Sequence, residues 1–167
     1  MATITINNTD WTILDAVRAA LAGATVNSAA VFPAVSVAAS PQQARQSQQA
    51  GKMPSAIVRY VGTVEGTCGG GEGFAVVELE LLLTARLARG VNEAAAVQEA
   101  LRLINGAKNA VMAAVPAAAK PVANETEFHD ALEWGRPRIE SEASDSPWVA
   151  AALPVRLAYP LASGTGH

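Results

Sequence analysis

The sequence of 167 residues has little of the chemistry that most enzymes and metal sites use. It contains one cysteine, Cys68, and two histidines, His129 and His167. A single cysteine excludes a disulfide within the chain and a zinc site built from several cysteines. The first residues lack a basic start followed by an apolar run, so they do not predict a secretory signal. We therefore expect folding in a reducing cytoplasm.

Long hydrophobic runs and clusters of one charge are also missing. Hydrophobic residues make up 50% of the chain, but the richest run, residues 107–119, is interrupted by Lys108, Asn109 and Pro116. It is shorter than the roughly 20 apolar residues that a membrane-spanning helix needs. Charged residues make up 16%, the net charge is −3, and the basic residues are scattered. This composition predicts no membrane segment and no nucleic-acid-binding surface.

No group of residues has the spacing of a catalytic, metal or cofactor site. His129 and Asp130 are adjacent, so on a strand they would point to opposite faces. The glycine-rich residues 66–73 lack the lysine and hydroxyl residue of a phosphate-binding loop, and a predicted strand follows them. We interpret them as an exposed hairpin tip. Glu78 and Glu80 share a strand face and could serve acid–base chemistry, but a face turned to water or to another protein is preferred.

Residues 74–87 form the longest alternation in the sequence. Every second side chain from Ala75 to Leu87 is apolar, and the intervening positions include Glu78, Glu80, Thr84 and Arg86. This pattern predicts one strand of about 45 Å, much longer than a typical strand, with a single buried face.

The remaining patterns predict two helices and several shorter strands. Helical spacing is seen at residues 10–22, with Trp11 as a core anchor, and at residues 92–115, with Asn92 as the cap and Pro116 as the end. Residues 28–39 predict an edge strand, and residues 55–65 predict a partner for the long strand. Residues 148–159 alternate around Pro154, which favours an edge strand or one paired on one side only.

These elements predict an α+β fold. We expect a mixed, mostly antiparallel sheet with one very long strand and two helices packed on one face. The whole chain, residues 1–167, is expected to be one domain with a flexible N-terminal arm, about residues 1–8, and a disordered C-terminal tail, about residues 161–167.

Residues 57–160 resemble the tail terminator, or tail completion, proteins of long-tailed bacteriophages. The similarity lies in VELELLLTARLARG followed by the helical NEAAAVQEALRLINGAKNAV, then LEWGRPRIES, and then the tryptophan and terminal strand of SPWVAAALPVRLAYPL. Members of that family have a mixed sheet with helices on one face and form hexameric rings. The family has no catalytic residues to transfer to this sequence, and this chain differs from it in its N-terminal segment and its glycine-rich tip.

The resemblance implies a structural virion protein without enzyme activity, cofactor or metal. It implies a homohexameric ring that caps the tail tube, ends its polymerisation and joins the tail to the head connector, while DNA passes through the opening. Its partners would be copies of itself, the tail tube protein and the connector. Its location would be the head-proximal end of the virion tail, after assembly in the host cytoplasm. The alternatives are a neck, head-closure or minor tail protein of the same particle, a peptide-binding module and a small α+β enzyme.

A ring needs contacts between different patches of neighbouring subunits. We expect the polar face of the long strand, its hairpin and the loop near residues 134–138 to supply part of them, with acidic groups lining the opening. The candidate interface residues are Glu78, Glu80, Arg86, Trp134, Arg136 and Arg138.

Overall fold

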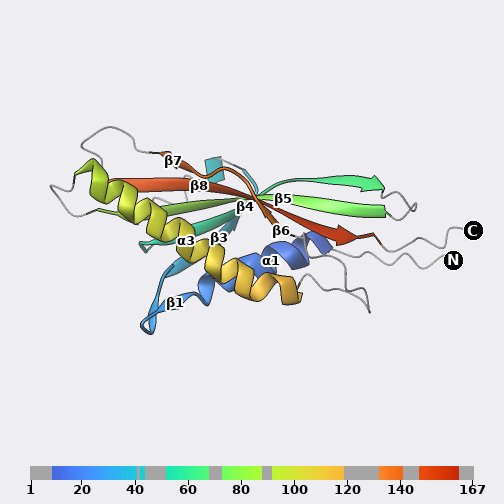
Figure 1. Cartoon of the computed structure of the whole chain (residues 1–167), viewed down its shortest axis with the longest axis horizontal. Coiled ribbons are helices and arrows are strands. Elements are labelled where there is room, and N and C mark those ends of the chain that lie inside the picture. Colours follow the sequence, from blue (N-terminus) through green and yellow to red (C-terminus); the bar gives the residue numbers. More distant parts are fainter. Residues whose placement is uncertain are drawn as a thin grey trace, which may run out of the picture.

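A computed structural model describes residues 9–40, 42–43, 52–67, 73–87, 92–118, 132–140 and 147–161. Two helices, α1 (Thr9–Ala22) and α3 (Glu93–Ala118), lie together on one side of a sheet (Figure 1). The strands are β1 (Thr25–Val26), β2 (Ala29–Ala30), β3 (Ala34–Ala38), β4 (Ser55–Thr67), β5 (Gly73–Arg86), β6 (Leu132–Trp134), β7 (Arg138–Glu140) and β8 (Trp148–Pro160).

The main sheet has the order β3-β4-β5-β8-β6, and β7 also pairs with β8. Among the described strands of the main sheet, only β3 and β4 pair in parallel; the other pairs are antiparallel. The predicted α+β fold, with a mixed and mostly antiparallel sheet, is confirmed. β1 and β2 form a separate two-stranded hairpin that turns through Asn27 and Ser28, both at positive φ.

β5 is the 14-residue central strand that the alternation predicts. Its predicted apolar side faces the helices, and Ala75, Val77, Leu79, Leu81, Leu83 and Ala85 are all buried there. Burial of each Val or Leu side chain is worth about 1.5–3 kcal/mol before the cost of ordering it, which fixes the register of the strand. We call the opposite side, which carries Val76, Glu78, Glu80, Leu82 and Thr84, the outer face.

The helices bury small residues as well as large ones. In α1 the buried side chains are Ile13, Leu14, Val17 and Leu21. In α3 they are Ala100, Leu103, Ile104, Ala107 and Val111. The helical spacing also predicts Val97, Leu101 and Met112 near the apolar stripe of α3, and this was wrong, because they are 44–55% exposed. Gly106 allows a close approach, since a Cβ there would lie 3.2 Å from Cγ1 of Val31.

Two further helix predictions need correction. Trp11 is 50% exposed and is not the core anchor that we predicted, because Ile13 and Leu14 occupy the buried side of the first turns. The second helix continues to Ala118 and does not end before Pro116. Its predicted start is confirmed, because Oδ1 of Asn92 accepts a hydrogen bond of 3.0 Å from the amide of Ala95.

β8 is an interior strand, and the prediction of an edge or one-sided strand was wrong. It pairs with β5 along its whole length, and on its other side with β6 and then β7. The carbonyl of Pro154 accepts a hydrogen bond from Gly135, so the missing N–H of Pro154 also turns to that side. β6 and β7 together form the edge beside β8, and Pro154 lies opposite the segment between them. The proline therefore breaks no ladder hydrogen bond. β7 was itself missed, since the sequence patterns predicted no strand at residues 138–140.

The hairpin of β4 and β5 is confirmed, but its tip is shorter than predicted. Gly66 pairs with Phe74 and Thr67 with Gly73, so only residues 68–72 separate the strands, and these lie outside the described residues. β3 is an edge strand as predicted, but it is limited to five residues because Ala29 and Ala30 pair with β1. The expected N-terminal arm and residues 162–167 of the expected tail lie outside the described residues. Among the described helices, none has a long enough apolar stretch to cross a membrane.

Candidate assembly surface

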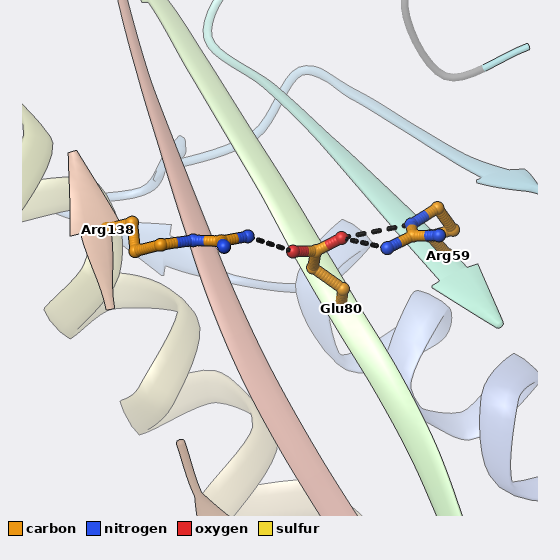
Figure 2. A network of polar contacts seen from close by, with 3 residues as sticks. All are labelled: Arg59, Glu80 and Arg138. Carbon is orange, nitrogen blue, oxygen red and sulfur yellow. Dashed lines mark hydrogen bonds and ion pairs between the residues drawn. The ribbon is translucent and has the colours of Figure 1, made fainter. Parts of the chain in front are cut away.

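The outer face of the sheet carries ion pairs where the sequence suggested free acidic groups. Glu80 on β5 lies opposite Arg59 on β4, and the two side chains form an ion pair. Nη2 of Arg138, from β7, lies 2.9 Å from the other carboxylate oxygen of Glu80. Figure 2 shows the carboxylate between the two guanidinium groups, which approach it from opposite sides. Glu80 therefore links the strands on both sides of the sheet centre.

Two residues with short side chains on β8 leave space for Arg138 to reach Glu80. Arg138 pairs with Ala152, and Glu80 pairs with Pro154, so the side chain of Arg138 passes over β8. Neither Ala152 nor Pro154 carries a long side chain that would block it. Gly135 packs closely at this point, because a Cβ there would lie 2.7 Å from Cβ of Pro154. The Gly135–Pro154 contact thus holds the edge strand in the position from which Arg138 reaches β5.

Glu80 is buried within the subunit, so it does not face water as an unpaired group, and its place in a subunit interface stays a prediction. The residue is 8% exposed and Thr84, on the same face, is 5% exposed. A buried carboxylate requires compensating charge and hydrogen bonds, and Arg59 and Arg138 provide both. The side chain of Leu82 is also partly buried within the subunit, because it packs against the buried Ala38 and Ile57.

Glu78 has a different environment on the same face. Its carboxylate lies 2.8 Å from Nη2 of Arg156 on β8, and the side chains are 29% and 57% exposed. Exposed pairs of this kind contribute little to stability. Because both glutamates are paired with arginines, neither supplies an unpaired negative charge on this face.

Of the other candidate interface residues, Arg138 joins Glu80, but Trp134 and Arg86 lie elsewhere on the subunit. Trp134 pairs with Val155 on the helix-facing side, where Nζ of Lys108 lies 5.8 Å from its ring centre. Its buried Nε1 has no hydrogen-bond partner among the described residues. Arg86 lies over the ring of Trp148 at 5.6 Å, at the far end of β5. Arg136 is exposed in the segment between β6 and β7.

A second polar cluster fixes the start of α1 to the sheet. The Tyr159 hydroxyl donates to Oδ1 of Asp10 over 2.7 Å, and the Thr63 hydroxyl donates to Oδ2 over 2.7 Å. The Tyr60 hydroxyl lies 2.7 Å from Oγ1 of Thr63 and donates to it, since Thr63 has already used its hydrogen. Burial, and then the hydrogen bond to Asp10, raise the pKa of Tyr159 well above its usual range.

Beyond this cluster the sheet continues as an arm. We define the arm as residues 64–67 of β4, 73–76 of β5 and 158–160 of β8, which pair with one another. These strand ends extend past both helices (Figure 1). The outer face of the arm has no charged side chain; it is formed by Val64, Gly66, Phe74, Val76, Ala158 and Pro160. Val64 is 58% exposed.

Sequence reasoning missed Arg59, Arg156 and the Asp10 cluster. Arg59 had a readable signal, because the alternation of residues 55–65 and the predicted hairpin place it near the acidic residues of the long strand across the ladder. Asp10 gave no such signal, since its partners lie 53 and 149 residues away in the chain. Cys68, His129 and His167 lie outside the described residues. Within the described residues, no three His, Cys, Asp or Glu side chains lie close enough to bind a metal ion.

Comparisons with known proteins leave the family open. No protein-family model matches the chain, and a search of curated proteins found no relative.

Proposed function

We propose that this protein is a structural subunit that assembles into a closed ring and, as such, caps the tail tube of a long-tailed bacteriophage. The observation that carries the assembly role is the arm. It extends past the helices and presents Val64, Phe74 and Val76 on an uncharged face. Exposed apolar surface without charges is typical of the centre of protein–protein interfaces. The specific role at the tail end rests on the sequence resemblance.

The proposed contact is head-to-tail, between the arm of one subunit and a different surface of the next, because such contacts close into rings. The ion pairs of Glu78 and Glu80 brace the strands that continue into the arm. In this proposal they act within the subunit and hold the arm straight. This revises the expectation that these two glutamates contact a neighbouring subunit.

Two exposed valines allow a matched test of the ring. Val64 is 58% exposed on the arm, and Val26 is 57% exposed on the β1–β2 hairpin. Either can be changed to glutamate without burying a charge in the subunit. Native mass spectrometry and light scattering should show a ring for the wild type and for Val26→Glu, and a single subunit with unchanged melting temperature for Val64→Glu. A wild type of one-chain mass at every concentration, or equal behaviour of the two variants, would contradict the proposal.

The role at the tail end has its own test. When purified rings are added to polymerising tail tube protein, electron microscopy should show shorter tubes with a ring at one end. Rings that bind the head connector and leave tube length unchanged would instead favour a neck or head-closure protein. The Val64→Glu variant serves as the control, because it should not cap tubes.

A further inference from the structure

One flank of α3 carries an exposed apolar stripe. Val97, Leu101 and Met112 are 44–55% exposed, and on a helix with 3.6 residues per turn they lie within about 60° of one another. Lys108 falls inside the same sector, and its Nζ lies 5.8 Å from the ring centre of Trp134 on β6. The stripe therefore lies on the flank of α3 that faces the edge of the sheet formed by β6 and β7.

Ile139 of β7 continues this surface on the sheet. It is 38% exposed and pairs with Ala151, whose side chain is buried on the helix-facing side. The β8 partner of Trp134 lies four residues further along the strand, a step of about 13 Å. From Lys108 back to Leu101 the helix covers about 10 Å. Both steps lead toward the start of β8, because α3 follows β5 and the end of β5 pairs with that start. Leu101 and Ile139 therefore lie at a similar level of the sheet.

The ten large hydrophobic side chains that are exposed in the described part of the chain gather at two edges of the sheet. Tyr60, Val61 and Val64 lie on β4 beyond the end of β3, where β4 is the outermost described strand. Four more form a surface at the opposite edge, which we call the edge patch: Val97, Leu101, Met112 and Ile139. Because most of the ten belong to two surfaces, they are not the single scattered residues of an ordinary monomer surface.

We propose that the edge patch receives the arm of the neighbouring subunit, with the β4 side of the arm against α3 and β7. This inference rests on the proposed function and names the second surface of its ring contact. Since the two surfaces lie at opposite edges of one sheet, they cannot meet within one subunit. Two different patches on opposite sides of a subunit are what a head-to-tail ring requires.

Charge selects the arm as the part of the second copy that fits. The outer face of the arm has no charged side chain, and the members of the edge patch are uncharged. The middle of the outer face instead carries the ion pairs of Glu78 and Glu80. Docking of those groups on an apolar patch would remove water from charges without new partners, which is costly.

The apolar surface of the arm is already formed within the subunit. Gly66 pairs with Phe74, and a Cβ at Gly66 would lie 2.7 Å from Cζ of Phe74. The aromatic ring therefore lies over the glycine and joins the apolar surface of β5 to Val64 on β4. A side chain that is held in place before docking loses less conformational entropy when the neighbour binds.

Cross-linking of the full-length chain tests which surfaces meet. In a Cys68→Ser background, Val64→Cys and Leu101→Cys are combined in one chain, treated with a short thiol-reactive cross-linker and run on a denaturing gel. We expect a ladder of covalent multimers up to the size of the ring, because each chain links to the next. Val64→Cys with Val26→Cys is the matched control and should give no ladder, since Val26 is exposed on the β1–β2 hairpin, outside both surfaces.

The single-cysteine variants separate a head-to-tail contact from symmetric ones. Each should remain one chain on the gel. Linked dimers of Val64→Cys alone would indicate contact between two arms, and linked dimers of Leu101→Cys alone would indicate contact between two α3 helices; either result would overturn the inference. Rings in native mass spectrometry without a ladder would overturn it and leave the proposed function standing, whereas a wild type of one-chain mass would overturn both.

A charge substitution gives a second readout that does not depend on cysteines. Leu101→Glu places a charge in the edge patch, and Asn109→Glu places one on the same helix about 80° further round. Both side chains are exposed, so neither variant buries a charge within the subunit. Native mass spectrometry should show single subunits with an unchanged melting temperature for Leu101→Glu and rings for Asn109→Glu. Equal assembly of the two variants would show that the edge patch is no part of the ring contact.

Discussion

The carboxylate of Glu80 pairs with two arginines on the outer face of the sheet. Its side chain is 10% exposed and lies between Arg59, at 21%, and Arg138, at 64%. Glu80→Gln removes the charge that both arginines neutralise and keeps the shape. Because Arg59 is left partly buried without its partner, we expect a loss of about 1–3 kcal/mol in the free energy of unfolding. Urea denaturation measures it.

Glu78 provides the matched control for that substitution. It lies on the same strand and face, but its pair with Arg156 is more exposed. Glu78→Gln should cost about 0–1 kcal/mol, because solvent screens exposed pairs. Equal losses for the two variants would mean that burial of Glu80 does not determine its contribution.

The Tyr159 hydroxyl predicts a specific response to alkaline pH. Its pKa in the folded protein is raised by burial and by Asp10, while the unfolded chain has a usual tyrosine pKa of about 10. Below pH 10 both states keep the proton, and the contribution of this group is fully present. As the pH rises above 10 the unfolded state releases the proton first, so stability falls towards the folded-state pKa. Tyr159→Phe should therefore reduce the slope of stability against pH above 10 in denaturation experiments. An unchanged slope would contradict the assignment.

Among the elements, the interrupted edge strand of β6 and β7 depends on one glycine. A Cβ at Gly135 would lie 2.7 Å from Cβ of Pro154, whereas a Cβ at Gly62 in β4 would meet nothing within 4 Å. Gly135→Ala should cost about 1–3 kcal/mol through this clash, and Gly62→Ala should be close to neutral. Thermal denaturation of both variants checks the difference. A melting temperature of Gly135→Ala equal to that of Gly62→Ala would show that the edge strand moves away without cost.

Across the whole molecule, one core joins the helices to β4, β5 and β8. Leu81 is fully buried near the middle of β5, and Leu81→Ala should cost about 2–5 kcal/mol. Since helices and sheet share this core, helical circular dichroism and tryptophan fluorescence should shift together, as in a two-state transition. Transitions that separate, or a loss below about 0.5 kcal/mol, would show that the face assignment of β5 is wrong.

The sequence by itself determined the elements whose periodicity is long. The alternation around Leu79, Leu81 and Leu83 fixed β5 and its buried side, because a shift by one residue would bury glutamates. The helix at Thr9–Ala22, the cap at Asn92 and the hairpin of β4 with β5 were equally readable, since each depends on neighbours in sequence. Trp11 shows the limit of such patterns, because helical spacing does not decide which margin of the apolar stripe is covered.

Only the tertiary structure decided the state of the polar groups and the place of β8. From the sequence, Glu80 is expected to be a solvated side chain. In the structure it is buried and paired, because Arg138, 58 residues away in the chain, reaches it across β8. In sequence, Pro154 favours an edge position for β8. In the structure, β8 is an interior strand, because Gly135, between β6 and β7, lies opposite the proline. The link of Asp10 to Tyr159 spans 149 residues. Local patterns carry no information on such contacts, because they form only when the sheet order brings distant strands together.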